Sequence, residues 1–325
     1  MASKPINPTT QFLILFSLCI LISCKKEKAV AVDFIQYQLP TELNLRDIKV
    51  ISPDTIWVAA GTQFDKGALL KTEDAADNWQ LKLDAGSEIR SFTFRNDRIY
   101  LTPIGNTIQS SADEAQNWTT LITPGWEYFT ACDFWDDSLG IVVGGENFGK
   151  GIVYRVKLSP SPTLIKVDTI QHELTDIHII NDSTCIAVGY GVILRSTDMG
   201  LNWIPDKARG DFFKYIHFID AQNGYVVGEY GSIYKTTDAG LSWTKIKSGT
   251  TVFNAKHRFK KVFFEDLNNG VIVGDQGLCW VTKNAGESWI PVDNLPAINL
   301  SALAIYSQKV YVGGAAGQLL TFEWP

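Results

Sequence analysis

Three loops of the chain place an acidic side chain between glycines. Glu146, Glu229 and Asp275 stand in the segments GGENFGKG, GEYG and GDQG, at equivalent places of a repeated pattern. We therefore expect all three on one face of the protein. Two carboxylates about 5–10 Å apart can hydrolyse a glycosidic bond, one as the acid and one as the base or nucleophile. Solvated acids are commoner in such loops, so we assign no catalytic residue and keep catalysis as an alternative to binding.

Cysteine and histidine show no pattern of a metal or nucleophilic site. Beyond residue 28 only Cys132, Cys185 and Cys279 remain, an odd number, each inside an apolar run. No CxxC pair occurs, and no two histidines have the spacing of metal ligands. The many glycines suit hairpins and form no phosphate-binding or dinucleotide fingerprint. The sequence therefore predicts buried free thiols, no metal and no cofactor.

The chain repeats a unit of about 40 residues, and each unit is expected to begin with a short strand. Basic side chains recur directly before the core of this first strand. Four of the seven residues at this position are basic, and the full column is Arg46, Arg90, Thr130, Thr175, Lys214, Lys260 and Ser301. If the repeats superpose, the column lies near the mouth of a central channel, where like charges would focus a field for an anionic ligand. Solvated strand ends are the simpler interpretation. The net charge of −6 argues against a nucleic-acid partner.

Aromatic and basic side chains in loops form a second part of the candidate binding face. Its members are Trp126, Tyr128, Phe212, Phe213, His257 and Arg258, together with Tyr190 and Tyr230 from the turns between strands. Rings with polar tips suit a protein partner or a glycan. Burial of some of these rings under the loops fits the sequence equally well.

The first thirty residues have the features of an export signal. The apolar run over residues 11–22 is shorter than a membrane span of about 20 residues and suits a signal-peptide core. The segment LISC at 21–24 resembles the lipobox of bacterial lipoproteins, which implies cleavage before Cys24 and its acylation. Ordinary cleavage is the alternative. We expect a signal peptide over 1–23, a tether over 24–32 and a folded body over 33–325.

The same resemblance predicts the cellular location. Lys25, rather than Asp, follows the cysteine, so the usual inner-membrane retention signal is absent. We therefore expect a lipid anchor in the bacterial cell envelope, with the outer membrane favoured. Exposure to the periplasm or to the cell surface stays open.

An eight-residue pattern recurs five times along the chain. It reads STDMGLNW at 196–203, and further copies start at residues 72, 111, 236 and 282. The copies resemble the Asp-box of bacterial neuraminidase repeats, with structural turns at Asp74, Asp113, Asp198, Asp238 and Asn284. A short carboxylate can accept hydrogen bonds from the N–H groups of a turn, and the Trp can bury its ring. Ala76 and Ala115 replace the glycine, so we expect strain in those two turns.

The segments between the boxes also repeat, and each unit of about 40 residues holds four short strands, as in a β-propeller blade. Seven first strands are expected, at Asp47–Val50, Phe92–Phe94, Cys132–Phe134, Asp176–Ile179, Tyr215–Phe218, Lys261–Phe264 and Ala302–Ile305. The last unit ends after its third strand, so we expect Phe34–Gln38 to supply its outer strand. The predicted fold class is all-β, a seven-bladed β-propeller closed by the N-terminal strand.

Units of the form D-I-x-F … G-Y-x-V-G-x-x-G-x-I-x-x-T-x-D-A-G-x-x-W resemble the photosystem II stability/assembly factor-like propellers, most clearly over 174–290. The resemblance implies an interaction or assembly-factor propeller. The basic patch of that family is largely absent, since the chain has only eight Arg. We predict a monomeric, non-enzymatic envelope lipoprotein that binds a protein partner. The alternative is a glycan-active, sialidase- or glycosidase-like, or glycan-binding propeller, although the Arg-Ile-Pro segment of the sialidases is not found.

Overall fold

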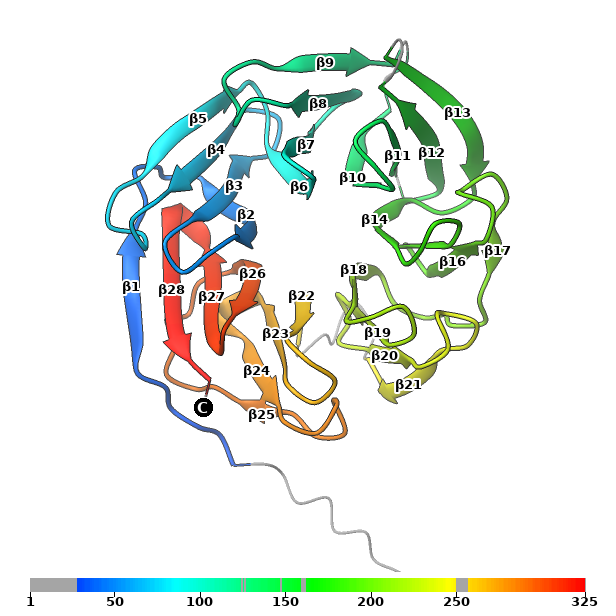
Figure 1. Cartoon of the computed structure of the whole chain (residues 1–325). Coiled ribbons are helices and arrows are strands. Elements are labelled where there is room, and N and C mark those ends of the chain that lie inside the picture. The colour runs from blue at the N-terminus through cyan, green and yellow to red at the C-terminus, as the bar shows by residue number, and fades with distance from the viewer. Residues whose placement is uncertain are drawn as a thin grey trace, which may run out of the picture.

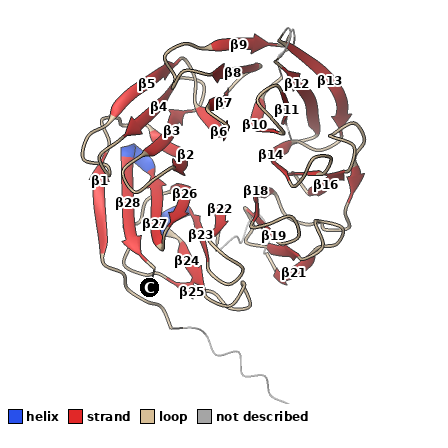
Figure 2. Cartoon of the chain, in the orientation of Figure 1, coloured by secondary structure: helices blue, strands red, loops and turns tan. Residues whose placement is uncertain are grey.

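The computed structural model describes residues 28–123, 125, 127–146, 148–158, 162–249 and 257–324. Over these residues 28 strands form seven four-stranded antiparallel sheets, arranged as blades around a central axis (Figure 1). Figure 2 shows that the regular structure is almost entirely strand, with the short 3-10 helices η2 (Asp275–Gly277) and η3 (Ala315–Gly317). The predicted seven-bladed β-propeller is confirmed. In the described part of the chain, no helix has the length and apolar character needed to span a membrane.

Blades 1–6 each run in chain order from the innermost to the outermost strand. Blade 1 consists of β2 (Asn44–Val50), β3 (Ile56–Thr62), β4 (Lys66–Thr72) and β5 (Gln80–Ala85). Blade 2 consists of β6 (Ile89–Arg95), β7 (Arg98–Pro103), β8 (Thr107–Ser111) and β9 (Thr119–Ile122). Blade 3 consists of β10 (Phe129–Phe134), β11 (Leu139–Glu146), β12 (Lys150–Lys157) and β13 (Thr163–Ile170). All three contain the first strand that the sequence predicted.

The next three blades follow the same plan. Blade 4 consists of β14 (Leu174–Ile179), β15 (Cys185–Gly189), β16 (Val192–Ser196) and β17 (Ile204–Pro205). Blade 5 consists of β18 (Phe213–Phe218), β19 (Gly224–Gly228), β20 (Ile233–Thr236) and β21 (Thr244–Lys247). Blade 6 consists of β22 (Phe259–Phe264), β23 (Gly270–Gly274), β24 (Cys279–Thr282) and β25 (Ile290–Pro291).

Blade 7 joins the two ends of the chain. Its inner strands are β26 (Leu300–Tyr306), β27 (Lys309–Gly314) and β28 (Gln318–Glu323), and β1 (Phe34–Gln38) pairs antiparallel with β28 from Phe34 opposite Phe322 to Gln38 opposite Gln318. Figure 1 shows blue β1 along the outside of red β28. The predicted closure by the N-terminal strand is therefore confirmed. The residues before β1 lie against blade 6, where Val30 N–H donates to the Pro291 carbonyl at 2.8 Å.

The hydrophobic core lies between the blades. Seven clusters of buried apolar side chains each join two neighbouring blades, as where Tyr225 and Val227 of blade 5 pack with Phe259 and Val262 of blade 6. The box tryptophans pack against the cluster between their own blade and the preceding one; they are Trp79, Trp118, Trp203, Trp243 and Trp289. The ring is thus held by seven similar interfaces rather than by one central core.

The Asp-box turns join the third and fourth strands and share one set of hydrogen bonds. In blade 4 the Ser196 hydroxyl donates to Asp198 Oδ1 at 2.8 Å and accepts from Gly200 N–H at 2.9 Å, while Asn202 N–H donates to Asp198 Oδ1 at 2.9 Å. Where alanine replaces the glycine, the backbone still adopts the left-handed conformation, with φ of 81° at Ala76 and 66° at Ala115. A residue with a Cβ is strained there.

Candidate binding site

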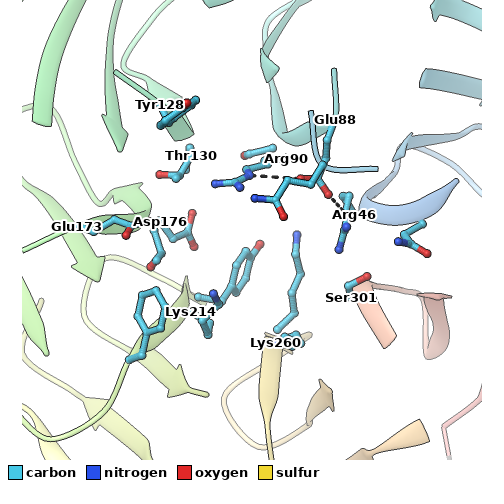
Figure 3. A pocket seen from close by; sticks show the side chains of 18 of the residues that line it. Arg46, Glu88, Arg90, Tyr128, Thr130, Glu173, Asp176, Lys214, Lys260 and Ser301 are labelled. Carbon is cyan, nitrogen blue, oxygen red and sulfur yellow. Dashed lines mark hydrogen bonds and ion pairs between the residues drawn. The ribbon is translucent and has the colours of Figure 1, made fainter. Parts of the chain in front are cut away.

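A central cavity of about 930 Å³ is lined by residues from all seven blades (Figure 3). It opens among the turns between second and third strands and the loops that connect successive blades; the Asp-box turns lie at the opposite end of the strands. Its lining includes every residue of the predicted column, namely Arg46, Arg90, Thr130, Thr175, Lys214, Lys260 and Ser301. The repeat position noted in the sequence therefore corresponds to a ring of side chains around one cavity.

A β-bulge in the first strand of each blade positions this ring. The register with the second strand shifts across one residue in all seven blades, as between Leu45 and Asp47 in β2 and between Phe213 and Tyr215 in β18. The residue skipped by the register is the column residue, Arg46 or Lys214 in these two cases. A bulge bends the strand and re-aims a side chain that regular alternation would send elsewhere.

Two of the basic column residues share one carboxylate. Arg46 Nε forms an ion pair with Glu88, and Arg90 Nε lies 3.4 Å from the other Glu88 oxygen. Figure 3 shows the Glu88 carboxylate between the two arginines. Glu88 stands in the loop between β5 and β6, and its side chain is only 5 % exposed. The positive charges of blades 1 and 2 are thus partly neutralised inside the cavity.

The basic residues of blades 5 and 6 surround Glu229. Arg258 Nη1, Lys214 Nζ and Lys260 Nζ lie 3.0, 3.6 and 3.7 Å from its carboxylate. Burial opposes ionisation of Glu229, but the neighbouring charges of Lys260, Lys214 and Arg258 outweigh burial and hold its pKa below the usual range. Lys260 also pairs with Asp275 at 3.7 Å. Of the three acids in glycine-bracketed loops, Glu146 and Asp275 line the cavity, and Glu229 holds these basic side chains.

These pairs correct the expectation of a field for an anionic ligand. The described lining contains five basic residues, Arg46, Arg90, Lys214, Lys260 and Lys261, and five acidic ones, Glu88, Glu146, Glu173, Asp176 and Asp275. Opposite charges within a few ångströms cancel most of each other's field at a distance. Four of the seven column residues are basic, and loops that the column does not include supply the compensating acids.

Below the ring, the cavity wall holds buried charges. Lys261 Nζ lies 2.5 Å from Asp47 Oδ1, and Lys49 Nζ lies 3.6 Å from the other Asp47 oxygen. Burial would raise the pKa of Asp47, but Lys261 and Lys49 lower it overall. Asp176 accepts a hydrogen bond from Ile216 N–H at 3.0 Å and has no such ion pair among the described residues; burial raises its pKa to about 7.

Aromatic rings surround part of the cavity. Tyr128 and Phe212 belong to its lining, together with Phe64 and Phe148 from the turns after β3 and β11. Phe64 lies 5.7 Å from Tyr128 between ring centroids, and Tyr190 lies 5.3 Å from Phe148 and 5.2 Å from Phe212. Phe64, Phe148 and Tyr190 are 59, 55 and 40 % exposed. These rings come from blades 1, 3, 4 and 5 and lie at the rim of the cavity.

Other members of the candidate face lie elsewhere. Phe213 is fully buried in β18, so its expected place in a loop surface is wrong; the strand begins two residues earlier than the predicted Tyr215. Tyr230 donates its N–H to Asp211 Oδ1 at 2.8 Å, and the His257 ring lies 4.7 Å from that of Trp280. Neither belongs to the cavity lining. Trp126 and Cys24 lie outside the described residues.

Sequence reasoning missed Phe64, Phe148, Glu88 and Glu173. A signal for the two phenylalanines was present, because FDKG at 64–67 and FGKG at 148–151 share the pattern F-x-K-G in equivalent turns. No comparable signal marks the two glutamates: Glu88 pairs with Arg46 of the preceding blade as well as with the nearby Arg90. Glu173 Oε2 accepts a hydrogen bond from Phe148 N–H at 3.0 Å.

Metal or thiol chemistry finds no support among the described residues. They contain no group of three or more His, Cys, Asp or Glu side chains that could hold a metal ion. Cys132, Cys185 and Cys279 are free and buried, and burial raises their thiol pKa values. His217 stacks on Phe263 at 4.4 Å, and burial lowers its pKa to about 3, as befits a packed, neutral ring.

Known proteins give a family match over part of the chain and a fold match over most of it. Residues 210–308, in blades 5 and 6 and the start of blade 7, match the sequence model of the photosynthesis system II assembly factor YCF48. No curated protein matches significantly. A solved structure of YCF48 bound to D1 peptide is 14 % identical, with a TM-score of 0.69 over 92 % of this chain and 98 % of that one.

Two further solved structures show how widely this fold is used. YCF48 from Cyanidioschyzon merolae is 18 % identical, with a TM-score of 0.68 over 90 % of this chain and 99 % of that one. A virginiamycin B lyase from Staphylococcus aureus is 9 % identical, with a TM-score of 0.69 over the same shares. At such identities the likeness shows the fold alone. The chain is a seven-bladed β-propeller whose fifth and sixth blades match the YCF48 family.

Proposed function

We propose that this propeller is a non-enzymatic scaffold that binds a protein partner through the face on which the central cavity opens, and that it acts in the assembly of that partner. The observation that carries the proposal is the rim of the cavity, where Phe64, Phe148 and Tyr190 expose 59, 55 and 40 % of their surface beside ionic side chains. Exposed rings grouped around a polar concavity are typical of protein-binding sites. The match to an assembly-factor family and the structural likeness to YCF48 bound to D1 peptide support it.

A site-specific photo-crosslinker tests this proposal. It is placed at residue 148, on the cavity rim, and in a second protein at residue 241, a 68 % exposed leucine in an Asp-box turn of the opposite face. We expect irradiation of whole cells to give a discrete adduct with another protein at residue 148 and none at residue 241. Equal labelling at both positions, or none at residue 148, would contradict the proposed face.

We also propose that the protein is a lipoprotein of the bacterial cell envelope, acylated at Cys24 and favouring the outer membrane. The LISC segment at 21–24 supports this. Residues 30–32 lie against blade 6 and the loop after it, since Val30 N–H donates to the Pro291 carbonyl and Asn294 Nδ2 donates to the Val32 carbonyl. Labelling with an alkyne fatty acid should mark the wild type and not the Cys24→Ser variant, which should also leave the membrane fraction. A labelled Cys24→Ser variant would contradict acylation at that residue.

The alternative, a glycan-active propeller, has one observation in its favour. Asp176 lines the cavity with a pKa of about 7, which suits a general acid at neutral pH. Its side chain is buried, however, and the nearby Glu229 is held ionised by three basic residues. Turnover of fluorogenic glycosides that is lost in Asp176→Asn would favour this alternative over the scaffold.

A further inference from the structure

The turns between the second and third strands contain a residue with a left-handed backbone in four blades. In blades 1 and 3 it lies in a three-residue turn, with φ of 61° at Phe64 and 60° at Phe148, and in blades 6 and 7 it lies in η2 and η3, with φ of 57° at Gln276 and 53° at Ala316. A left-handed residue on this face is therefore not always aromatic. A bulky residue at positive φ is strained. Blades 1 and 3 carry that strain together with an exposed ring.

The two phenylalanines belong to a larger group, which we call the aromatic arc: Phe64, Tyr128, Phe148, Tyr190 and Phe212. Phe64 contacts Tyr128, and Phe148, Tyr190 and Phe212 contact one another, with edge or tilted ring contacts and centroids 5.2–5.8 Å apart. Four of the five line the cavity, and Tyr190 contacts two that do. The arc therefore consists of two groups of rings on the rim, one that joins blades 1 and 3 and one that joins blades 3, 4 and 5.

Acidic side chains accompany the arc. Glu173 accepts a hydrogen bond from the Phe148 N–H at 3.0 Å, and Glu146, two residues before Phe148, forms an ion pair at 3.0 Å with Lys150, whose side chain is 44 % exposed. Figure 3 shows Glu173, Asp176 and Tyr128 on one side of the cavity and Arg46, Glu88 and Arg90 across from them. The basic residues of the column pair with Glu88, Glu229 and Asp275, whereas Glu173 forms no ion pair among the described residues and interacts with Lys214 only at longer range. Negative charge thus remains beside the rings.

A cation already lies against one ring of the arc. Lys214 Nζ is 4.3 Å from the centroid of Phe212. A ring face attracts a cation through its quadrupole, and the attraction grows as water is excluded. The whole body favours cations too, since residues 29–325 carry 25 basic and 34 acidic side chains, a net charge of −9.

From this juxtaposition we infer that the aromatic arc, with Glu146 and Glu173, binds an extended, positively charged segment of a partner protein in which Lys or Arg alternates with aromatic residues. The inference rests on the proposed scaffold function and adds the chemistry of the partner. The basic side chains of the segment stack on the rings and approach the two carboxylates, while its aromatic residues fill the cavity mouth. An acidic segment would instead be repelled by the like charges of Glu146 and Glu173.

Fluorescence anisotropy with labelled twelve-residue peptides tests the inference on the full chain in detergent. One peptide alternates Arg or Lys with Phe or Trp, a second has Glu in place of every basic residue, and a third has Ser in place of every aromatic. The proteins are the wild type, Phe64→Ala/Phe148→Ala, Glu146→Gln/Glu173→Gln, and the control Ile122→Ala/Ile165→Ala. The control residues are 65 and 55 % exposed on the outer strands β9 and β13.

The basic aromatic peptide should bind at least about tenfold more tightly than either other peptide. The double phenylalanine variant should lose about tenfold in affinity, and the double glutamine variant should lose several-fold and show weaker salt dependence. The control should stay within about twofold. Both phenylalanines are more than half exposed, so the variant should fold, which its thermal unfolding checks.

Tighter binding of the acidic peptide, or equal binding by the wild type and the double phenylalanine variant, would overturn the inference. Neither result touches the scaffold proposal, because a crosslinked partner at residue 148 would still support it. Conversely, peptide preference as expected with no crosslink at residue 148 would support the chemistry and contradict the physiological scaffold. The two proposals can therefore fail separately.

Discussion

The two faces of the propeller use the same residue types in opposite ways. On the Asp-box face, five turns repeat one set of hydrogen bonds and one packing position for Trp. On the cavity face, equivalent turns carry Phe64, Phe148, Tyr190 or Asp275, and their contacts differ from blade to blade. The contacts that repeat in the Asp-box turns are those that each blade needs in order to fold. The contacts that differ from blade to blade lie on the cavity face, where residues of all blades form one asymmetric site.

The difference between the two faces also appears in the pKa values of two aspartates. Hydrogen bonds from Asn202, with a minor opposing effect of burial, lower the pKa of Asp198 in the box to about 2. Burial raises the pKa of Asp176 on the cavity wall to about 7. A carboxylate inside its turn is thus stabilised in the charged form, whereas one in the cavity wall is destabilised in it. Four sets of variants test this contrast between the two faces.

The largest effect is expected at a glycine of the cavity face. A Cβ on Gly189 would lie 2.0 Å from the Glu173 carbonyl oxygen, and equivalent clashes arise at Gly144 and Gly274 with the loops that cross them. Gly189→Ala should destabilise the protein by about 3 kcal/mol or more in chemical denaturation, because backbone must move. Gly86→Ala, whose Cβ meets no atom within 4 Å, is the control and should change little. If Gly189→Ala left the unfolding free energy unchanged, the close backbone packing on the cavity face would not be needed for stability.

Asp176→Asn should stabilise the protein at high pH. Its pKa is about 7 in the folded state and 3.8 when unperturbed, so folding favours the protonated form and stability falls as pH rises from about 4 to 7. Asparagine stays neutral and keeps an acceptor for Ile216 N–H. We expect a gain of about 2 kcal/mol at pH 8 and almost none at pH 4, measured by urea unfolding. A loss of stability at pH 8 would mean that the charge of Asp176 is needed.

Asp198→Ala should destabilise the protein by about 1–2 kcal/mol at pH 7, because it removes three hydrogen bonds to the carboxylate. The pKa of Asp198 is lowered from 3.8, so this contribution is present above pH 3.8 and fades as pH falls through about 2. Asp198→Asn is the matched control, since Asn284 makes equivalent bonds from Thr282 and Ser288 in blade 6. An equal loss in both variants would assign the effect to charge rather than to turn geometry.

The smallest effect is expected at Ala115. Ala115 has a φ of 66°, so Ala115→Gly relieves left-handed strain and should raise the unfolding free energy by about 0.5 kcal/mol. The loss of packing by the buried Ala115 methyl group reduces this gain. The reverse change, Gly200→Ala at φ of 79°, should destabilise, because its Cβ would also lie 2.3 Å from Ile141 Cδ1. Thermal unfolding of both variants gives the order. Destabilisation in both would show that methyl packing outweighs backbone strain.

The fold could be predicted from sequence because each blade is a local unit with its own signals. The box turns, the four-strand period and the missing last strand each depend on residues close together in the chain, and β1 has the bounds that were predicted. The column of Arg46, Lys214 and the others also followed from repeat alignment. The β-bulge that orients the column side chains could not be predicted, because a one-residue register shift does not show in the hydrophobic pattern.

By itself, the sequence determined how many blades form, where they begin and which residue of each faces the axis. Only the tertiary structure decided what the resulting ring can bind. Lys261 meets Asp47 across 214 positions of the chain, and Glu88 and Glu229 neutralise a column of which they are not members. Secondary structure depends on neighbours along the chain and repeats with it. Electrostatic interaction depends on distance through space, so the balance of charges in the cavity is set only when the seven blades close around one axis.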